Sequence, residues 1–585
     1  MGLLRKGNIL SWKDLERKKE IIKNRGISQF IKVYSRNKSK ITSTSAFGEE
    51  IELMILKFSD NKYKLFCGSE SIIGKADSTF VEYARYMVEI SSVVPYEQKT
   101  LRNVEKSILQ KIVDIENIVD TDIFVLMMPC YPHMNYSYFY DTKPLTDDTT
   151  LSLHFPDNAI TNHKRFESFT RNIRNRRGRK VEGYIEVMED KHTLLDNSNK
   201  YITIDSMGQG MGCCCLQVTM QGECVDSARY IYDMMGVLSP LLLRITRGTP
   251  CANGKLLRTE TRWEMLEISV DCRTDLERGF NSIISSSYTK YPYESGIPKS
   301  RFSPIDLFIS TSDNFKDKYN DINVPIHQNI LQRLLKSGID ERLSKHVASL
   351  FIRDPMVSYE ETNEDHYDDF ENIQSSNWRS VRFKIPTESS EKKLRGWKVE
   401  VRPMEVQATA FENTAFVYFT YLLSQAIVKF NLNFYIPISK IDTNFIRANE
   451  FIRHPSDFKN KLGKDEQLFY YRSNIEDPDD DILLEGTIEE IFMGKGDYKG
   501  IIYYVKQIIE ENFNEDREFL IKYVQFIEDK ITNKYISLSD WIRKFVLTHS
   551  DYKNDSILTD TILNDLIKKM IDIRKENSVD YLINE

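Results

Sequence analysis

Residues 207–221 have the sequence MGQGMGCCCLQVTMQ, a glycine-rich turn that leads through three cysteines into a strand. Because side chains alternate along a strand, Leu216 and Val218 fall on an apolar face. Cys215 and Gln217 fall on the opposite face, which carries small polar groups. Polar side chains without partners are costly to bury in a core. We therefore expect the apolar face to pack inside the protein and the polar face to line a cavity.

The composition indicates a folded protein from a reducing compartment. Of 585 residues, 41% are hydrophobic and 11% aromatic, which excludes a disordered chain. The net charge of −7 does not favour a nucleic-acid-binding protein. The eight cysteines form no CxxC pair and none lies beyond Cys272, so neither a disulfide framework nor a zinc site is indicated. With no secretory signal and no apolar run that could span a bilayer, we expect a cytoplasmic protein that binds neither membranes nor nucleic acid.

The order of the expected elements favours an α+β fold. Strands are expected in residues 47–130 and at 201–205, 213–221, 262–270 and 397–403. Helices are expected in residues 1–35, at 226–238, in 327–350 with a break at Gly338, at 411–430, and from 498 to the end. Residues 356–396 are expected to form an acidic and polar loop region. Because strands and helices interleave without a regular βαβ alternation, a doubly wound sheet is disfavoured.

Two strand-like segments, FGEEIELM and FVEYARYMVE, contain four glutamates that are candidates for a metal site. Glu50 and Glu52 share one strand face about 6.5 Å apart, where two carboxylates repel each other unless a cation lies between them. Glu82 and Glu89 are seven residues apart, so they meet only across a bend, a bulge or two separate strands. For each segment taken alone, exposed surface glutamates are the simpler interpretation.

Arginines in three further segments suit the binding of carboxylates or phosphates. WKVEVRP places Glu400 and Arg402 on one strand face, where a simple ion pair is the alternative to a joint metal and phosphate site. ETRWE places Arg262 on an expected strand. The basic run 163–180 suits polyphosphate, although a solvated basic face is the commoner explanation. With no Walker loop, GxSxG or HExxH motif, this chemistry favours magnesium and a nucleotide.

Taken in order, these motifs resemble the eukaryotic-type catalytic subunit of glutamate–cysteine ligase. The matching stretches include FGEEIE, EYARYMVE, RFESFTRNIRNRRG, MGQGMGCCCLQVTMQ, TRWEMLEISVDCRT, HVASLFIRDP, FENIQSSNW and VEVRPMEVQATAFEN, and they span nearly the whole chain. The resemblance implies a glutamine-synthetase-like α+β fold, in which a curved, mainly antiparallel sheet forms a funnel with added helices. It also implies one large catalytic unit, composed of an N-terminal helical segment (1–35), a sheet-bearing catalytic core (36–455) and a mainly helical C-terminal region (456–585).

The activity implied by the resemblance is the ATP-dependent ligation of L-glutamate to L-cysteine through γ-glutamyl phosphate, the first step of glutathione synthesis. The implied ligands of two or three Mg²⁺ ions, with Mn²⁺ as an alternative, are Glu50, Glu52, Glu82, Glu89, Gln217 and Glu400. The implied catalytic arginines are Arg262 and Arg402. The implied walls of the amino-acid pocket are Pro129, Met211, Cys215 and Trp378, with Arg262 as a further substrate contact. Arg174 and Arg177 are candidate contacts for the phosphates of ATP.

Glutathione as a feedback inhibitor and a modifier subunit are implied as further partners. The chain departs from the family pattern after Glu89, where ISSVVPY lacks the usual glycines, and at Cys213, where asparagine is common. No cysteine in the C-terminal region is available for a disulfide with a regulatory subunit. A ligase for another acceptor amine and an inactive scaffold remain as alternatives. An inactive scaffold has no physical need for six candidate ligands and two arginines around one site.

Overall fold

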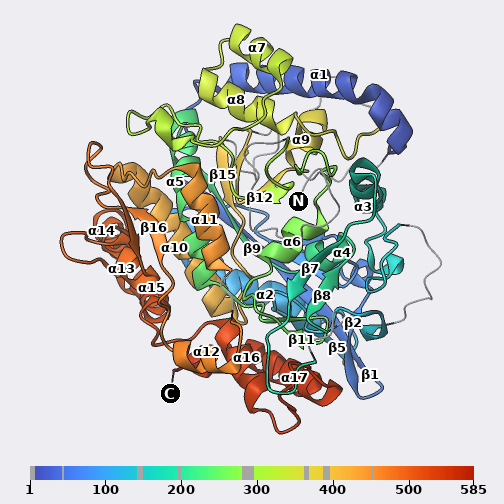
Figure 1. The fold of residues 1–585 in the computed structure, drawn as a ribbon. Helices are drawn as coiled ribbons and strands as arrows, with labels where there is room; N and C mark the ends of the chain where they lie inside the picture. The colour runs from blue at the N-terminus through green and yellow to red at the C-terminus, as the bar shows by residue number, and fades with distance from the viewer. Residues whose placement is uncertain are drawn as a thin grey trace.

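The computed structural model describes residues 7–42, 45–140, 149–194, 199–279, 296–360, 368–386, 396–449 and 452–584. Its centre is a nine-stranded sheet with helices around it (Figure 1). Every strand pair of this sheet is antiparallel except β2 with β6. The expected α+β class with a mainly antiparallel sheet is therefore confirmed.

The sheet is built from strands that are far apart in the sequence. They are β1 (Phe47–Ser59), β2 (Lys62–Phe66), β3 (Thr79–Val81), β4 (Met87–Ser91), β5 (Ile123–Leu126), β6 (Phe139–Tyr140), β9 (Leu216–Gln221), β14 (Val381–Lys384) and β15 (Lys398–Val401). The order β14-β15-β9-β1-β2-β6 runs across the sheet, while β4 and β5 also pair with β1, and β3 pairs with β4. The long strand β1 thus organises the sheet.

Strand β1 carries different partners along its two halves. Its first half pairs with β9 and β4, and its second half pairs with β5 and β2. Met54 pairs with both β4 and β5, so these two strands lie on opposite edges of β1. The first half of β1 therefore lies between β4 and β9, and it brings the acidic segments beside the cysteine-rich segment.

Two long helices cover one face of the sheet. They are α5 (Val225–Ile245), which packs against β14 and β15, and α10 (Ala410–Lys429), which packs against β9. Both helices are buried along most of their length, as their apolar sequences require. Thr409 and Glu412 begin α10 with a reciprocal capping box. Because these helices cover the apolar face, the polar residues of β9 and β15 point to the other side.

The remaining helices form groups around this core (Figure 1). α1 (Trp12–Asn37) packs against α7 (Gln328–Lys336) and α9 (Asp368–Gln374), and α7 packs against α8 (Glu341–Leu350). α2 (Val104–Glu116) packs against α10, and α4 (Gly208–Met211) packs against α6 (Trp263–Ser269). The others are α3 (Lys164–Arg177), α11 (Ile438–Ala448), α12 (Pro455–Lys461), α13 (Ile488–Met493), α14 (Ile501–Asn512), α15 (Arg517–Ile531), α16 (Leu538–Thr548) and α17 (Asp560–Glu576).

Four two-stranded ribbons complete the regular structure of the described residues. They are β7 (Gly183–Glu186) with β8 (Tyr201–Ile204), β10 (Cys251–Ala252) with β11 (Lys255–Leu256), β12 (Phe302–Ser303) with β13 (Trp378–Arg379), and β16 (Phe469–Arg472) with β17 (Leu483–Gly486). The ribbon of β12 and β13 is parallel, and it carries Trp378, one of the predicted site residues.

Three of the predicted elements were wrong in detail. Residues 262–270 form α6 rather than a strand, because a short and almost fully buried run shows no periodicity that separates the two. Residues 356–396 contain α9, β13 and β14, while 361–367 and 387–395 lie outside the described residues. The strand expected from Cys213 begins at Leu216, and the turn before it is the helix α4. The helices at 327–350 and 411–430 are confirmed.

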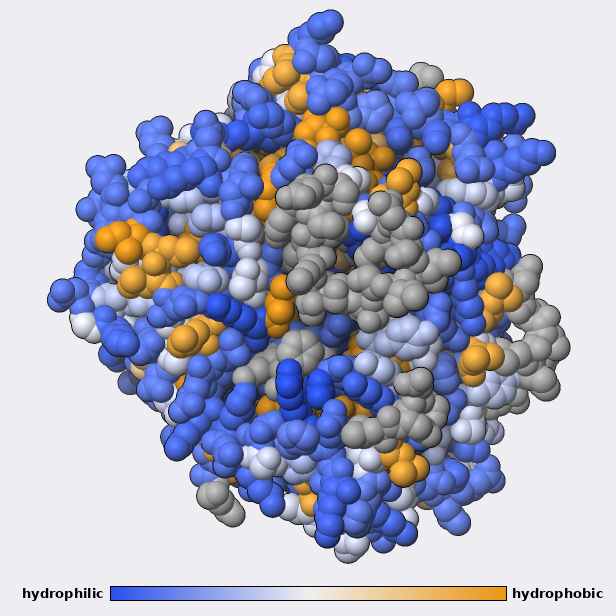
Figure 2. Space-filling model, in the orientation of Figure 1, coloured by the Kyte–Doolittle hydropathy of each residue, from blue (hydrophilic) through white to orange (hydrophobic). Residues whose placement is uncertain are grey.

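The surface is mostly hydrophilic on the face shown in Figure 2, and its hydrophobic side chains form small separate groups. All eight cysteines belong to the described part of the chain and are free thiols. Within that part, none of the helices combines the length and the apolar character needed to cross a lipid bilayer.

Candidate active site

The register of the sheet places the predicted carboxylates side by side on its polar face. Glu52 on β1 lies opposite Glu89 on β4, and Glu50 lies opposite Gln217 on β9. Glu82 follows β3, whereas Glu89 lies on β4. These two glutamates therefore come from two separate strands. Glu52, Glu82 and Glu89 are buried, so the interpretation as exposed surface glutamates is wrong for these three residues.

Burial and the charges of neighbouring carboxylates raise the pKa of Glu52, Glu82 and Glu89. Burial, together with the charge of Glu89, raises the pKa of Glu52 to about 7, although Arg262 opposes this shift. Burial, together with the charge of Glu52, raises the pKa of Glu82 to about 7. Burial also raises the pKa of Glu89, whose Oε2 atom has no hydrogen-bond partner. A cation among these groups would relieve both the repulsion and the unmet acceptor.

Glu52 also connects the acidic strands to the cysteine-rich segment. Its Oε2 atom accepts the backbone N–H of Cys215 at 2.8 Å, and its Oε1 atom lies 3.5 Å from Nε2 of Gln217. The same amide nitrogen lies 3.3 Å from Sγ of Cys215. The expectation that Cys215 and Gln217 belong to one polar wall is therefore confirmed.

Glu400 lies in a different electrostatic environment, surrounded by cations. Its carboxylate contacts Nζ of Lys384 at 2.6 Å and the guanidinium groups of Arg402 and Arg382 at 2.7 and 3.2 Å. Burial opposes ionisation, but Lys384, Arg382 and Arg402 hold the pKa of Glu400 well below its usual range. Lys384 also lies 3.8 Å from Glu50, so it joins β14 to β1. One side of the site is thus acidic and the other is rich in guanidinium and ammonium groups.

A cavity of about 60 Å³ lies between these two sides. Six of the predicted residues line it: Glu52, Glu82, Met211, Gln217, Trp378 and Arg402. A larger hollow of about 740 Å³ between Leu307 and Lys345 contains none of the predicted residues. We take the smaller cavity as the candidate site, because six of the predicted residues line it and carboxylates there face guanidinium groups.

The two predicted catalytic arginines are held by different hydrogen-bond partners. Arg402 donates from its NH1 atom to Oε1 of Gln217 at 2.5 Å as well as to Glu400. Arg262 lies at the N-cap of α6, where its backbone N–H donates to Glu405 at 2.6 Å and its NH2 atom donates to the carbonyl of Met404 at 3.3 Å. Arg262 is therefore fixed by a loop and a helix start, and not by the strand that its sequence suggested.

The predicted walls of the amino-acid pocket come from three segments. Met211 ends α4, and Trp378 on β13 meets the ring of Phe169 edge-on, with centroids 5.7 Å apart. Cys215 is buried, and burial raises the pKa of its thiol, so it contributes shape rather than charge. Pro129 accepts the backbone N–H of Cys214 at 2.7 Å, which places it beside the cysteine segment. Cys215 and Pro129 are not among the residues that line the cavity.

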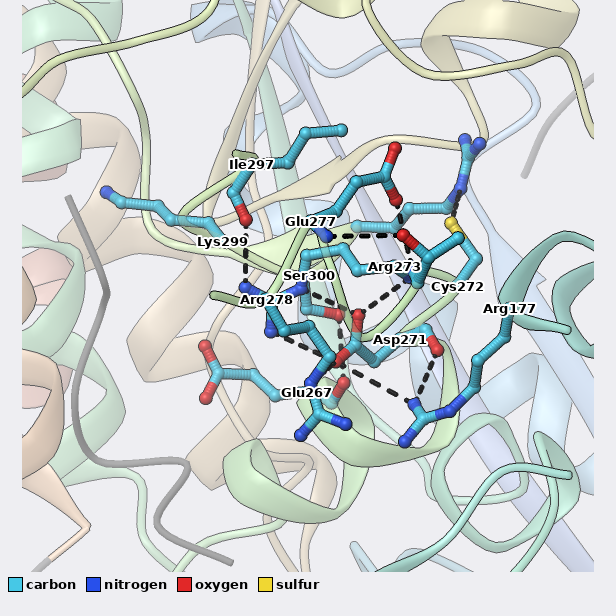
Figure 3. Close-up of polar contacts among 12 residues, drawn as sticks. Arg177, Glu267, Asp271, Cys272, Arg273, Glu277, Arg278, Ile297, Lys299 and Ser300 are labelled. Carbon is cyan, nitrogen blue, oxygen red and sulfur yellow. Dashed lines mark hydrogen bonds and ion pairs between the residues drawn. The ribbon is translucent and has the colours of Figure 1, made fainter. Parts of the chain in front are cut away.

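The basic run forms α3, and its last turn is occupied by structural contacts. Arg174 donates to the carbonyl of Thr149 at 2.6 Å. Arg177 is buried and donates to the carbonyl of Asp271 at 2.8 Å. Figure 3 shows Arg177 turned toward Asp271, whose carboxylate also binds Arg273 at 2.8 Å. A contact of Arg174 or Arg177 with ATP stays a prediction.

Sequence reasoning missed three cationic residues of the site. Arg165, in the first turn of α3, lines the cavity, and its NH2 atom donates to Ser375 at 2.7 Å. Arg382 lines the cavity from β14, and Lys384 on the same strand contacts Glu400. The alternation of Arg382 and Lys384 around Phe383 is a period-two pattern that indicates a strand. Their segment was expected to be a loop, which hid this pattern.

The donors present suit Mg²⁺, although they do not form a closed cage. Among the residues described, no three His, Cys, Asp or Glu side chains are close enough to hold a metal ion by themselves. Mg²⁺ is commonly bound by one or two carboxylates together with substrate phosphates, so such a cage is not required. The unpartnered oxygen of Glu89 and the raised pKa of Glu52 and Glu82 are the observations that fit a hard divalent cation.

The fold and the cavity together define an α+β protein with a site suited to a divalent cation and phosphate groups. A family model described as glutamate-cysteine ligase matches residues 1–573. The glutamate–cysteine ligase of Dictyostelium discoideum is 35% identical, with 98% of this chain and 97% of that protein covered. The catalytic subunit of glutamate–cysteine ligase from Homo sapiens is 32% identical, with 98% and 96% covered. The chain therefore belongs to the glutamate–cysteine ligase family.

Among solved structures, a glutamate–cysteine ligase from Francisella tularensis in complex with AMP is similar over 93% of this chain and 91% of that chain. Its sequence identity to this chain is 11%, and the TM-score is 0.42.

Proposed function

We propose that the protein joins the γ-carboxylate of L-glutamate to the amine of L-cysteine at the expense of ATP, giving γ-glutamylcysteine, ADP and phosphate. Family membership over residues 1–573 supports this activity. The observation that carries it in the structure is the cavity in which Glu52 and Glu82 face Arg165, Arg382 and Arg402. Phosphoryl transfer needs positioning and charge neutralisation more than covalent chemistry from the protein, and this cavity offers both.

The proposed metal site uses the polar face of the sheet. Its residues are Glu50, Glu52, Glu82, Glu89, Gln217 and Glu400, with two or three Mg²⁺ ions, or Mn²⁺, as the cations. When bound, Mg²⁺ supplies charge neutralisation at the phosphates of ATP. Glu400 contacts Lys384 and Arg402, and each of these cations can move to a phosphate and release a carboxylate oxygen of Glu400. Glu400 can therefore change from pairing with cationic side chains to binding a metal ion.

The first chemical step activates glutamate. A γ-carboxylate oxygen attacks the γ-phosphorus of ATP, the bond to the β-phosphate oxygen breaks, and ADP leaves from γ-glutamyl phosphate. Arg402 is placed at the edge of the cavity to hold the transferring phosphoryl group, with Arg165 and Arg382 adding positive charge beside it. Arg262 binds the carboxylate of glutamate or the acyl phosphate from the start of α6.

The second step forms the amide bond. The amine nitrogen of cysteine attacks the acyl carbon of γ-glutamyl phosphate, phosphate leaves, and the amine gives up a proton. Met211 and Trp378 form an apolar side of the cavity that excludes water from the reactive acyl phosphate. Cys215 and Pro129 lie next to each other in the structure, since Pro129 accepts the backbone N–H of Cys214. The protein thus contributes an apolar side and cationic groups to the reaction.

A single assay tests the activity and separates it from two alternatives. The protein is incubated with ATP, Mg²⁺ and L-glutamate, with L-cysteine, 2-aminobutyrate or no amine, and both ADP and the dipeptide are measured. We expect amine-dependent ADP release with stoichiometric γ-glutamylcysteine. ADP release only with a different amine would indicate a related ligase, and no amine-dependent ADP would indicate an inactive scaffold.

The contact of the basic run with ATP needs a separate test. The side chain of Arg174 is half-buried and donates to the carbonyl of Thr149, and Arg174→Glu reverses its charge. If Arg174 binds phosphate, this variant should raise the apparent KM for ATP while KM for glutamate stays unchanged. An unchanged KM for ATP would exclude the contact. Arg177 is a poorer choice for this test, because its buried pairing with Asp271 would be lost at the same time.

The remaining proposals concern context. We infer a cytoplasmic protein that acts as one catalytic unit, with residues 1–35, 36–455 and 456–585 as its helical segment, sheet-bearing core and mainly helical C-terminal region. Glutathione as a feedback inhibitor and a modifier subunit as a partner are proposed on family membership alone. Inhibition of the assay by added glutathione, competitive with glutamate, would support the first of these.

A further inference from the structure

A buried carboxylate near the candidate site contacts two loops at once. Glu405 follows β15 and has no exposed surface. Its Oε1 atom accepts the backbone N–H of Arg262 at 2.6 Å and the hydroxyl of Thr249 at 3.1 Å. Its Oε2 atom accepts the backbone N–H of Gly248. No step of the proposed reaction uses this carboxylate.

The loops that Glu405 connects are those that carry proposed substrate contacts. Gly248 lies against Pro129, since a Cβ atom added to this glycine would be 3.0 Å from Cγ of Pro129. Cys215 forms an isolated antiparallel bridge with Glu405 itself. The Arg262 guanidinium donates to the carbonyl of Met404, the residue before Glu405. The side chain of Glu405 therefore joins the segments of Gly248 and Arg262, and the backbone of Glu405 bridges to Cys215.

The charge of Arg262 and hydrogen bonds from peptide groups and a hydroxyl oppose the burial of the Glu405 carboxylate. Within the described residues no lysine or arginine side chain forms an ion pair with it. Its acceptors are filled by two backbone N–H groups and one hydroxyl, which fix direction as well as charge. Because a carboxylate offers acceptors at both oxygens, it can bind both loops simultaneously, whereas a neutral amide would present a donor to one of them.

The loop that contains Gly248 is held by other contacts as well, so its fold does not depend on Glu405 alone. Arg247, next to Gly248, binds Asp540 of α16 at 2.9 Å and Asp465 at 3.2 Å. The backbone N–H of Ser539 also donates to the carbonyl of Arg247 at 3.1 Å. At the start of α6, Asn449 accepts the backbone N–H and the hydroxyl of Thr261, while Glu405 is the acceptor of the backbone N–H of Arg262 itself.

We infer that Glu405 is a positioning residue, which holds the backbone of Arg262 so that its guanidinium reaches the carboxylate of bound glutamate. This inference rests on the proposed function and adds a residue that touches neither substrate. It makes the region after β15 a support for substrate binding, because Glu405 contacts the start of α6 through its carboxylate and the cysteine segment through its backbone.

A double-mutant cycle tests the inference. Glu405→Gln keeps the size of the side chain but presents an NH₂ donor to an N–H donor of Arg262 or Gly248. We expect kcat/KM for glutamate to fall roughly ten- to one-hundred-fold, as the loss of a charge-assisted hydrogen bond implies. In an Arg262→Ala background, where the positioned group is gone, Glu405→Gln should change kcat/KM by less than about twofold. Rates are measured with enzyme in excess over ATP, so that slow variants remain quantifiable.

Asp233 provides the matched control. It is a fully buried carboxylate that accepts the backbone N–H groups of Ile309 and Ser310 and the hydroxyl of Tyr435, the same set of donors as at Glu405. Asp233→Asn should lower the thermal midpoint and leave KM for glutamate unchanged. Equal losses from Glu405→Gln in the two backgrounds, or an Asp233→Asn effect on KM of the same size, would contradict the inference. Absence of glutamate-dependent ADP release in the wild type would instead contradict the proposed function itself.

Discussion

Glu52 on β1 lies directly opposite Glu89 on β4, so two buried carboxyl groups face each other across neighbouring strands. Like charges in directly opposite positions of a sheet are destabilising. The protein tolerates this arrangement by holding the pKa of both groups above the usual range, because burial and the neighbouring charge favour the protonated forms. Without a cation, protonation therefore relieves the repulsion between the two groups.

Glu89→Gln should separate the stability of the acidic pair from its use in metal binding. The variant replaces a carboxyl group whose raised pKa favours the neutral form with an amide of the same shape, so without Mg²⁺ we expect the free energy of unfolding to change by less than about 1 kcal/mol. The rise in thermal midpoint that Mg²⁺ gives the wild type should be lost, and kcat should fall by about 100-fold or more. Thermal unfolding with and without Mg²⁺, together with ADP release, measures all three quantities.

The control for Glu89→Gln is Glu16→Gln, at an exposed position of α1. This variant should change neither the Mg²⁺ response nor the rate. A Glu89→Gln protein that keeps the full response to Mg²⁺ would contradict the placement of Glu89 in the metal site.

Glu52→Gln should abolish turnover and leave the protein folded. The amide oxygen of glutamine can still accept the backbone N–H of Cys215, which Glu52 accepts at 2.8 Å. The loss is therefore confined to the negative charge that a hard divalent cation requires. ADP release should fall below about 1% of the wild-type rate, while the thermal midpoint measured without Mg²⁺ stays within a few degrees. Wild-type rates in this variant would overturn the metal assignment.

Glu400→Gln should behave differently, because this carboxylate already balances three cations. Lys384, Arg402 and Arg382 all lie within 3.2 Å of a residue that has no exposed surface. Removal of one partner from a buried charge cluster costs about 3–5 kcal/mol. Denaturant unfolding should show this loss without Mg²⁺, together with loss of activity.

Asp275→Asn is the control for Glu400→Gln. Asp275 pairs with Arg179 at 2.7 Å, but its side chain is 40% exposed. An exposed pair of this kind contributes at most about 1 kcal/mol. Equal destabilisation by the two substitutions would show that burial of the Glu400 cluster has no energetic consequence, contrary to the structure.

The alternation of side chains made the faces of the main strands predictable. Glu50 and Glu52 alternate with Ile51 and Leu53, so their shared face followed from a period of two, and the structure confirms it. The element that packs against the opposite face of β1 was not predictable in the same way. Glu49 points to the opposite side, where it pairs with buried Lys111 of α2 at 3.0 Å, because a helix that was not expected within residues 47–130 packs there.

The site was predictable where a motif lay on one strand and less so where strands from distant segments meet. Glu82 follows β3 and Glu89 lies on β4. The pairing of these two strands brings the two glutamates together. Arg382 escaped prediction because a short strand between polar segments has too few residues for a clear period. Arg262 was identified by motif but assigned to a strand, since the run after it is buried on all sides in α6.

A further prediction concerns pH and a lysine far from the cavity. Lys530 on α15 has a side chain only 3% exposed, with Nζ at 3.4 Å from Gln407 and 4.0 Å from Glu412. Burial lowers the pKa of Lys530 to about 8, although Glu412 opposes the shift. In the unfolded chain the value returns to about 10.4. Between these two values the folded protein binds fewer protons than the unfolded chain, so the contribution of Lys530 to stability rises with pH.

Lys530→Met should remove this pH dependence. The difference in free energy of unfolding between wild type and variant should shift in favour of the wild type by about 3 kcal/mol as pH rises from 8 to 10.4. Denaturant unfolding at several pH values in this window measures the difference. Lys569→Met, at an exposed position of α17, is the matched control and should give a difference that does not change with pH. A flat difference for Lys530→Met would mean that Glu412 stabilises the ammonium group enough to offset its burial.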